Sequence, residues 1–419
     1  MEGRELIAFL AMTMALSALG VDFLLPAFPE IRAEFGLAPG STVVSRFITT
    51  YFVGLAAGQL VIGPLADRFG RRVLLRAGIA LYLIGAGLTI LAPTFASLLA
   101  ARFVWGLGAA AGRVLTVAIV RDRFAGAAMA RTISLVMAVF VTVPVVAPAL
   151  GVALLRLLSW DQLVAVNMGA AVVVLAWTLR LDETLPRASR RTLQPRELVS
   201  SVGRVLRHPA SGPLIAAQTV LFGGFASYLS TSEVVYRDVF ERGALFPLLF
   251  GGMALVMGVA TLVNSRIVER VGLRRMIRID LAGYLIGTVL LLIAGVVTGG
   301  RPPLPAYLFV LAIILSSHAV LIPNLSARAM EPMGDIAGTA SAVNGAMLIG
   351  GGALLGAAID RSYDGTVLPL SAAMVLIGLV TALLLRRGLT EVSGTVDPSP
   401  DPRSDRPRGD RSASPRGPS

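Results

Sequence analysis

The chain has 419 residues, of which 55% are hydrophobic and 15% charged, and its mean hydropathy is +0.77. A soluble domain of this length carries more charge, so the composition excludes an ordinary soluble protein and indicates a chain that folds in lipid. Cysteine is absent, which excludes disulfide bonds, thiolate nucleophiles and cysteine metal sites.

Twelve stretches are apolar enough to cross a bilayer, since a helix needs roughly 20 residues to span about 30 Å of hydrocarbon. We expect an all-α membrane protein whose twelve helices form two six-helix bundles. The first span contains an acid and is too long for a signal peptide, so we expect it to stay in the mature protein. The expected spans are 6–28, 44–66, 74–92, 96–120, 132–155, 161–179, 213–235, 245–265, 276–297, 304–327, 336–359 and 367–385.

All 37 basic residues are arginine and give a net charge of +12, an excess that also occurs in proteins that bind nucleic acid. Their placement favours a membrane explanation. If the amino terminus is cytoplasmic, the inward segments up to Arg387 hold 23 arginines and the outward loops hold seven. This bias predicts a multi-pass protein of the cell membrane, with both termini in the cytoplasm and no nucleic-acid partner.

Asp22 lies in the first span, within GVDFLLPAFPEI, about six residues before its outer end. An ionisable group at membrane depth is costly, so it is a functional candidate by default. A nearby cation would favour the charged acid and a dry cavity the neutral one, so a conformational change could make Asp22 bind and release a proton. The alternative is an acid that sits at a helix end in the membrane interface.

The loop GPLADRFGRRVLL, residues 63–75, places a charge cluster between the second and third spans. Asp67 would stand at a helix end, and arginines would follow on a tight turn that Gly70 permits. Such a cluster can make charge-assisted contacts that hold one conformation and break in another, or it can merely fix the topology. The expected switch residues are Gly63, Asp67, Arg68, Gly70, Arg71 and Arg72.

Two arginines lie in the fourth span. Arg102 follows its outer start by about six residues and so shares the depth of Asp22. Arg113 comes eleven residues later, which brings it within ~20° of the same helix face and ~16 Å deeper. We expect both to face one cavity, with Gly106 and Ala109 between them leaving room for a ligand or a partner helix. Alternatively, Arg113 snorkels towards the cytoplasm or pairs with an acid.

A hydrophilic segment after the sixth span divides the chain. We expect an N-terminal bundle (1–180), a cytoplasmic linker (181–212), a C-terminal bundle (213–387) and a disordered cytoplasmic tail (388–419) that is rich in Pro, Ser, Asp and Arg. The loop NSRIVERVGLRR between the eighth and ninth spans repeats the acid, arginine and glycine spacing of the 63–75 loop at an offset of 202. This match indicates an internal repeat of six spans.

His318, in the tenth span, and Tyr228, in the seventh, are further candidates for the substrate cavity, although a lone intramembrane histidine is more often a packing residue. His208 lies too far from His318 along the chain for a metal site. No phosphate-binding Gly-Lys loop and no nucleophile-base constellation occurs. We therefore expect no metal, no cofactor, no ATP-driven pumping and no enzyme.

The pattern G-x-L-A-D-R-x-G-R-R-x-x-L of residues 63–75 resembles the signature loop of the major facilitator superfamily. The resemblance implies two six-helix bundles that rock about a central site and a loop that acts as a conformational latch on the cytoplasmic side.

The first span narrows the resemblance, because DFLLPAFP is similar to the signature of bicyclomycin and chloramphenicol resistance type drug–proton antiporters. RFVWGLGAAAG, AIVRD, DETLPR and AGTAS extend it over residues 6–387. The resemblance implies that Asp22 is the acid that couples transport to protons and that Arg102 tunes this acid. In the fifth span Pro148 and Gly151 match the core of the antiporter motif, but Ala147 and Val152 replace its usual glycines.

The expected function is proton-driven export of a small organic compound by a monomer, with the compound, protons and lipid as partners. One alternative is a transporter of a native metabolite. Another is a transporter-like sensor or scaffold, but such a protein would be expected to carry a large soluble domain, and the sequence contains none.

Overall fold

The computed structural model describes residues 1, 3–38, 40–190 and 195–391. Within these ranges, twelve helical segments are long and apolar enough to cross a membrane, and no strand occurs. The predicted all-α fold with twelve spans is therefore confirmed. The greater part of the predicted tail, residues 392–419, lies outside the described residues.

The helices form two groups separated by a short helix, α8 (Pro195–Arg207). The first group is α1 (Gly3–Asp22), η1 (Leu25–Ala27), α2 (Phe28–Glu34), η2 (Thr42–Ser45), α3 (Arg46–Phe69), α4 (Arg71–Ile90), α5 (Phe95–Arg123), α6 (Gly126–Leu155) and α7 (Trp160–Trp177). The second group is α9 (Ser211–Val234), η5 (Val235–Val239), η6 (Gly243–Leu245), α10 (Phe246–Val271), α11 (Leu273–Val297), α12 (Leu304–Met330), η7 (Glu331–Ile336), α13 (Ala337–Ala346), η8 (Met347–Gly351), α14 (Gly352–Asp360) and α15 (Leu368–Glu391).

Several helices extend beyond the spans expected from hydropathy. α6 begins at Gly126 rather than 132, and α10 continues to Val271 rather than 265. Hydropathy falls where charged residues begin, but arginine and glutamate are good helix formers, so the helix continues past the apolar span. α15 likewise continues past the expected span, through Arg386 and Arg387 to Glu391, into the segment assigned to the tail. The structure also differs from the sequence expectation at α8, which lies in the segment expected to be only a hydrophilic linker.

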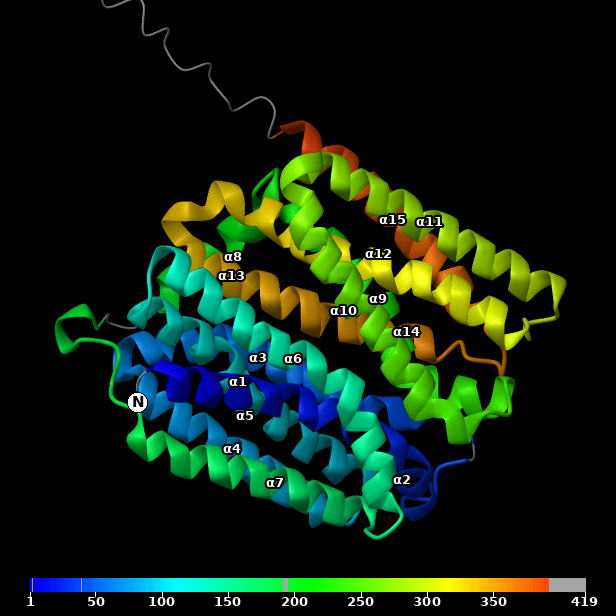
Figure 1. Cartoon of the computed structure of the whole chain (residues 1–419), viewed down its shortest axis with the longest axis horizontal. Coiled ribbons are helices and arrows are strands. Elements are labelled where there is room, and N and C mark those ends of the chain that lie inside the picture. Colours follow the sequence, from blue (N-terminus) through cyan, green and yellow to red (C-terminus); the bar gives the residue numbers. More distant parts are fainter. Residues whose placement is uncertain (2, 39, 191–194, 392–419) are drawn as a thin grey trace, which may run out of the picture.

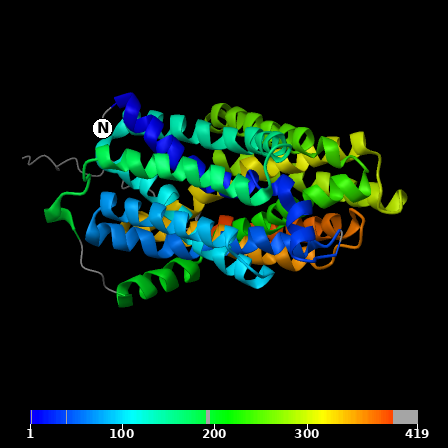
Figure 2. The same cartoon turned by 90° about the horizontal axis from the view of Figure 1, so that it is seen from below.

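The two groups form two bundles that lie side by side (Figure 1). The long axes of the two bundles point roughly the same way in both views (Figure 2). We call them the N-half, α1 to α7, and the C-half, α9 to α15. They meet along two lines, where α3 packs against α13, η8 and α14, and where α6 packs against α10. The segments η1 and η2 also pack against α9, and the whole contact between the halves is called the seam.

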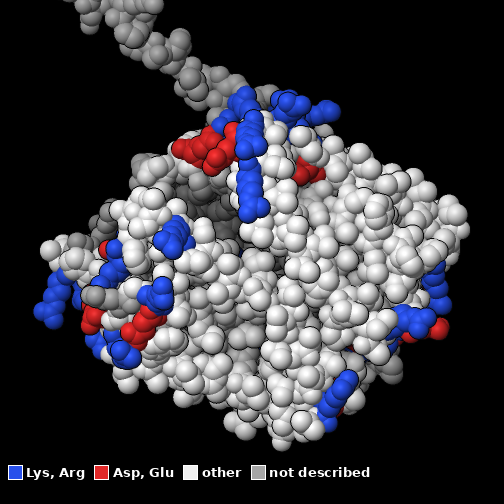
Figure 3. Space-filling view, in the orientation of Figure 1, with Lys and Arg blue, Asp and Glu red and all other residues white. Residues whose placement is uncertain are grey.

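On the face drawn in Figure 3, charged side chains gather at the two ends of the molecule, and the band between them is nearly free of charge. We call the end that carries residues 181–190 and 195–210 the linker face and the opposite end, which carries residues 35–38 and 40–45, the distal face. Near the linker face the surface is hollowed between the two halves (Figure 3). An uncharged belt of this kind fits the hydrocarbon layer of a bilayer.

Glycines bring α5 close to its neighbours in the N-half. A Cβ on Gly106 would lie 2.0 Å from the Tyr51 carbonyl oxygen of α3, and one on Gly85 of α4 would lie 2.3 Å from the Trp105 amide nitrogen. Helices in lipid associate largely by close packing, so small residues at the contact stabilise them. The space beside Gly106 is therefore filled by a partner helix.

The backbone of the 63–75 loop recurs in the C-half. Gly70 ends α3 with φ +102° and ψ 155°, and Gly272 ends α10 with φ +86° and ψ 139°. Each glycine amide donates to the carbonyl four residues earlier, that of Ala66 and that of Val268. Both glycines have a positive φ, which side chains disfavour. The shared turn supports the internal repeat at an offset of 202.

Gly106→Ala should destabilise the N-half by about 1–3 kcal/mol, because its new methyl group overlaps the α3 backbone. The expected result is a lower melting temperature in circular dichroism of the detergent-solubilised protein. Gly169→Ala in α7 is the matched control, since a Cβ there would meet nothing within 4 Å. Equal melting temperatures for the two variants would contradict this account of the packing.

Candidate functional site

α1 breaks directly after Asp22. Pro26 has no amide hydrogen to donate to the Asp22 carbonyl, and the chain tightens into the short helix η1. The Leu24 amide accordingly donates to the Val21 carbonyl, at 3.2 Å, instead of to Gly20. The break thus leaves the Gly20 carbonyl without its usual helical donor in the interior of the N-half, where an unpaired carbonyl is costly.

Arg102 supplies the missing donor. Its Nη2 donates to the Gly20 carbonyl at 2.8 Å, and its Nε donates to the Phe47 carbonyl at 3.2 Å. The side chain is fully buried, and its guanidinium lies over the rings of Phe47, Tyr51 and Trp105, with 3.9 Å to the nearest ring centre. Aromatic faces stabilise a cation that has no carboxylate partner. Arg102 is therefore held at the level of the α1 break.

Asp22 lies beside this cluster without a bond to it. It is 5% exposed, and no described side chain donates a hydrogen bond or forms an ion pair with its carboxylate. Arg102 approaches within two residues of Asp22 along α1, yet it bonds the backbone, and its buried Nη1 has no hydrogen-bond partner among the described residues. The structure thus places an acid and a free donor at one depth without pairing them.

The segment around Pro148 and Gly151 packs on this same break. A Cβ on Gly151 would lie 2.6 Å from the Phe23 carbonyl oxygen and 3.4 Å from Pro26. α6 remains one continuous helix through its two prolines, and a few residues earlier its Val145 carbonyl faces Gly251 of α10. α6 therefore contacts both the α1 break and the seam.

Arg113 lies deeper in α5 and is half-buried. Within the described part of the chain its guanidinium forms no hydrogen bond and no ion pair, and it lies 5.8 Å from the ring centre of Phe140 in α6. Arg113 is thus an unpaired cation in the N-half interior, on the same helix as Arg102.

On the other side of the seam, His318 and Tyr228 are buried behind phenylalanines. The His318 ring stacks on Phe225 with 4.8 Å between ring centres, and Tyr228 stacks on Phe250 at 5.9 Å. Phe222 and Phe225 are only half-buried. Sequence reasoning missed these two residues, although they lie on the same helix as Tyr228.

Phe222 also packs edge-on against Phe52 of α3, with 5.9 Å between ring centres. A row of aromatic side chains therefore crosses the seam where Phe52 contacts Phe222. It comprises Phe52, Phe222, Phe225, Tyr228 and His318.

The charges of the 63–75 loop bind within the N-half. Arg71 donates to Asp67 at 2.5 Å and to Asp122, at the end of α5, at 3.2 Å. The Glu183 carboxylate, which belongs to the DETLPR stretch, accepts the Arg71 amide at 2.8 Å. A Cβ on Gly70 would lie 2.3 Å from Glu183, so this position needs glycine for space as well as for its φ.

The remaining loop residues lie further out. Arg72 donates to the Leu179 carbonyl at 3.3 Å, and the Arg68 guanidinium lies 5.1 Å from the Phe69 ring centre. Gly63 has no atom within 4 Å of a Cβ position. The loop thus joins the ends of α3, α5 and the segment after α7.

An ion pair joins the two halves at the distal face. Arg32 of α2 donates to Glu233 of α9, both side chains are buried, and Glu233 also accepts from Arg237 at 2.7 Å. Neither Arg32 nor Glu233 is among the site candidates drawn from the sequence. The four-residue spacing of Glu233 and Arg237 is a signal that could have identified one pair of the network. The Arg32 contact crosses the seam, so no local pattern predicts it.

The comparisons with known proteins agree with this architecture. The sequence profile of the major facilitator superfamily matches residues 10–357. The chain belongs to the major facilitator superfamily. It is accordingly a multi-pass membrane transporter rather than an enzyme.

Three relatives cover most of the chain. It is 31% identical to an uncharacterized MFS-type transporter, YdgK, of Bacillus subtilis, over 91% of this chain and 95% of that one. It is 26% identical to a bicyclomycin resistance protein homolog of Haemophilus influenzae, over 85% and 88%. It is 30% identical to the multidrug resistance protein MdtL of Escherichia coli, over 84% and 87%.

Solved transporters share the fold. A partially occluded inward open conformation of the xylose transporter XylE from Escherichia coli superimposes with a TM-score of 0.69 at 14% identity, over 91% of this chain and 96% of that one. A POT family transporter in complex with 5-aminolevulinic acid gives 0.72 at 13% identity, over 94% and 96%.

Glu233→Gln should loosen the distal seam, because it leaves the buried Arg32 without its counter-charge, and breaking a buried pair costs about 3–5 kcal/mol. The measurement is maleimide labelling of Ser45→Cys, a buried distal position in a chain without other cysteines. We expect labelling at least about tenfold faster, the change that 1.4 kcal/mol produces.

Glu241→Gln is the control, since Glu241 is an exposed acid at the same end. The same labelling rate in both variants would show that the ion pair does not hold the distal face closed.

Proposed function

We propose that this transporter is a proton-driven exporter of small organic compounds. It acts as a monomer in the cell membrane, with the linker face and both termini in the cytoplasm. The relatives named for bicyclomycin and multidrug resistance support export of drug-like compounds. The arginine-rich linker face supports the orientation, because cytoplasmic segments of membrane proteins are enriched in basic residues.

The observation that carries this proposal is the unpaired Asp22 carboxyl beside Arg102. A buried carboxylate without a counter-charge is costly, so the site favours a neutral, protonated Asp22 when it is dry. The free Nη1 of Arg102 can stabilise the charged form once the helices shift. A change in packing around the α1 break therefore alternately favours binding and release of a proton.

In this proposal, α6 couples the protonation of Asp22 to movement at the seam. Gly151 touches the backbone just after Asp22, and Val145 of the same helix touches α10 of the C-half. A movement of the α1 break must therefore be accommodated by α6, which also forms part of the contact between the halves. In the proposed cycle, residues 1–180 and 213–387 rock against each other, and residues 181–212 connect them.

The 63–75 loop is proposed as the switch of this motion. In the present state the distal seam is joined by Arg32 and Glu233, whereas the surface is hollowed near the linker face (Figure 3). Arg71 is then held by Asp67 and Asp122 inside the N-half. Closing the linker face would bring this cluster against the C-half, where its charges can form new contacts.

Arg113 and the aromatic row define the proposed substrate site. The half-buried rings of Phe222 and Phe225 offer apolar surface, and the Arg113 guanidinium offers an unpaired positive charge. An anionic or zwitterionic compound with an apolar body matches both features. The same charge favours the second candidate, a native metabolite that carries a carboxylate, so substrate charge must be tested directly.

Asp22→Asn should abolish export driven by a pH gradient, because an amide cannot take up and release the proton. The measurement uses proteoliposomes with an imposed pH gradient and labelled chloramphenicol, bicyclomycin and tetraphenylphosphonium as probes. The folded state is checked by circular dichroism.

Asp182→Asn is the matched control, since this acid is exposed at the linker face. Full gradient-driven export of any probe by Asp22→Asn would refute the coupling role. If the unmutated protein exports the probes at the same rate with and without the pH gradient, proton-driven transport is refuted.

Arg113→Gln should shift preference away from anionic and zwitterionic compounds while sparing proton coupling, since Asp22 lies about three turns away. Arg113→Lys keeps the charge but loses the planar fork, so we expect an intermediate result. The measurement is transport of a panel of anionic, neutral and cationic compounds at fixed pH. Arg156→Gln, at an exposed arginine, is the control. An unchanged ranking across the panel would leave Arg113 as a packing residue.

A further inference from the structure

A second buried carboxyl lies in the C-half, at the end of α14. Asp360 is 4% exposed, and its two carboxylate oxygens accept hydrogen bonds from Ser227 and Ser230 of α9, each at 2.6 Å. No basic side chain lies within ion-pair distance of it among the described residues. Within the described ranges the carboxyl is therefore held by neutral hydroxyl groups, and Ser45 of η2 supplies a third one from the N-half.

The hydroxyl groups around Asp360 can serve both of its protonation states. The charged form accepts from both serines. When the carboxyl carries a proton it can donate to Ser230, because the Ser230 hydroxyl has a second acceptor of its own, the Ser227 carbonyl, at 3.1 Å. No group is left unpaired in either state, so the site can bind and release a proton without a change of fold.

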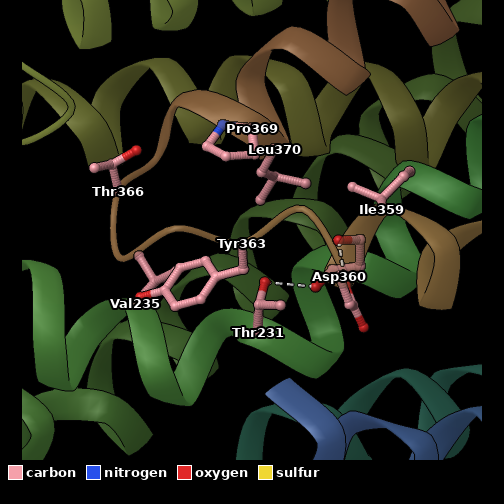
Figure 4. Close-up of a pocket in the computed structure, with 9 residues that line it drawn as sticks. Thr231, Val235, Ile359, Asp360, Tyr363, Thr366, Pro369 and Leu370 are labelled. Carbon is pink, nitrogen blue, oxygen red and sulfur yellow. Dashed lines mark hydrogen bonds between the residues drawn. The ribbon is translucent and has the colours of Figure 1, made fainter. Parts of the chain in front are cut away.

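Asp360 also borders a small cavity on the distal side. The cavity has a volume of about 10 Å³, about the space of one water molecule. Thr231 and Tyr363 lie on one side of it, and Pro369 and Leu370 lie on the other (Figure 4). A water here would link the carboxyl towards the distal face.

The N-half covers Asp360 in this state. The Thr42 hydroxyl of η2 donates to the Asp360 carbonyl at 2.9 Å, across the seam. Opening the distal face would separate these residues and admit water to the carboxyl. Closing it removes that water, and burying a charged carboxylate costs more than burying a neutral one.

We propose that Asp360 is a second proton-binding group, in the C-half, which takes up a proton as the distal face closes. This inference deepens the proposed function, on which it depends for the direction of proton movement. Two carboxyls in different halves, Asp22 and Asp360, would then bind protons in one cycle. The proton site of the C-half sits at the gate itself, whereas Asp22 acts through α6.

Other ionisable groups surround Asp360 and must be separated from it. Those on the packed elements are Arg32, Arg46, Glu233, Arg237, Asp238, Arg361, Tyr363 and Asp364. Glu233 and Asp238 are paired with arginines. Burial raises the pKa of Tyr363 to about 12, so its phenol stays neutral in the range tested. Asp364 is exposed on the loop after α14 and serves as a control.

The test measures the distal gate directly. Spin labels on Ala38→Cys and Ala244→Cys, exposed positions of the two halves, report the distance across the distal face, and the chain has no cysteine to interfere. Distances are recorded in lipid nanodiscs between about pH 5 and pH 9, the range in which a buried carboxyl can titrate. All variants carry Asp22→Asn, so that the first acid contributes nothing.

We expect the closed population to grow as the pH falls in this background. Asp360→Asn should remove the pH dependence and leave the gate closed, whereas Asp364→Asn should leave the curve unchanged. Ser227→Ala combined with Ser230→Ala removes the two donors of α9 to the charged form and leaves the contact with Ser45 of η2 in place. Closure should then occur at a pH higher by at least about one unit, and this readout decides the matter if Asp360→Asn does not fold.

Two outcomes would overturn the inference. One is a gate that loses all pH dependence through Asp22→Asn alone. The other is a pH dependence that persists after Asp360→Asn, or an unshifted midpoint in the double serine variant, which would point to Glu233 or Asp238. Neither outcome would contradict gradient-driven export through Asp22, so the two proposals fail separately.

Discussion

The hydrogen bond from Arg102 to the Gly20 carbonyl is the interaction around which the N-half is arranged. In lipid no water can satisfy a backbone group that a helix break releases, so another part of the protein must do so. Pro26 creates the break, and Arg102 satisfies it from α5. The bond fixes α5 against α1, and the guanidinium gathers aromatic rings around it. Asp22 is left at the break with a buried carboxyl that no side chain of the described ranges pairs with.

The seam between the halves is built differently along its length. At the distal face it is polar, with Arg32 bound to Glu233 and Thr42 bound to the Asp360 carbonyl. Further along, contacts of small residues such as Gly251 and Gly350 take over. A hydrogen-bonded pair such as Arg32 and Glu233 is either formed or broken. Packing between small residues, in contrast, allows one helix to slide along another. This arrangement suits a joint that opens at one end while the middle stays packed.

The two halves repeat the backbone but not the chemistry. Gly70 and Gly272 make the same turn at an offset of 202. In the N-half the next residue is Arg71, which forms ion pairs, whereas in the C-half it is Leu273, which cannot. Arg102 and Arg113, which form no ion pair with any described residue, belong to the N-half, and the hydroxyl-bound carboxyl Asp360 belongs to the C-half. The repeat therefore supplies a symmetric frame with unlike polar groups.

The sequence by itself determined the twelve spans, the helical fold, the family and the candidates Asp22, Arg102 and Arg113. Hydropathy, charge bias and the 63–75 pattern are local properties, and a charge inside an apolar run is visible without coordinates. The tertiary structure alone decided the partners. Arg102 bonds a backbone carbonyl rather than Asp22, and Arg32 reaches a residue about two hundred positions away. Such contacts depend on how helices from separate parts of the chain meet, and no spacing along the sequence encodes that distance.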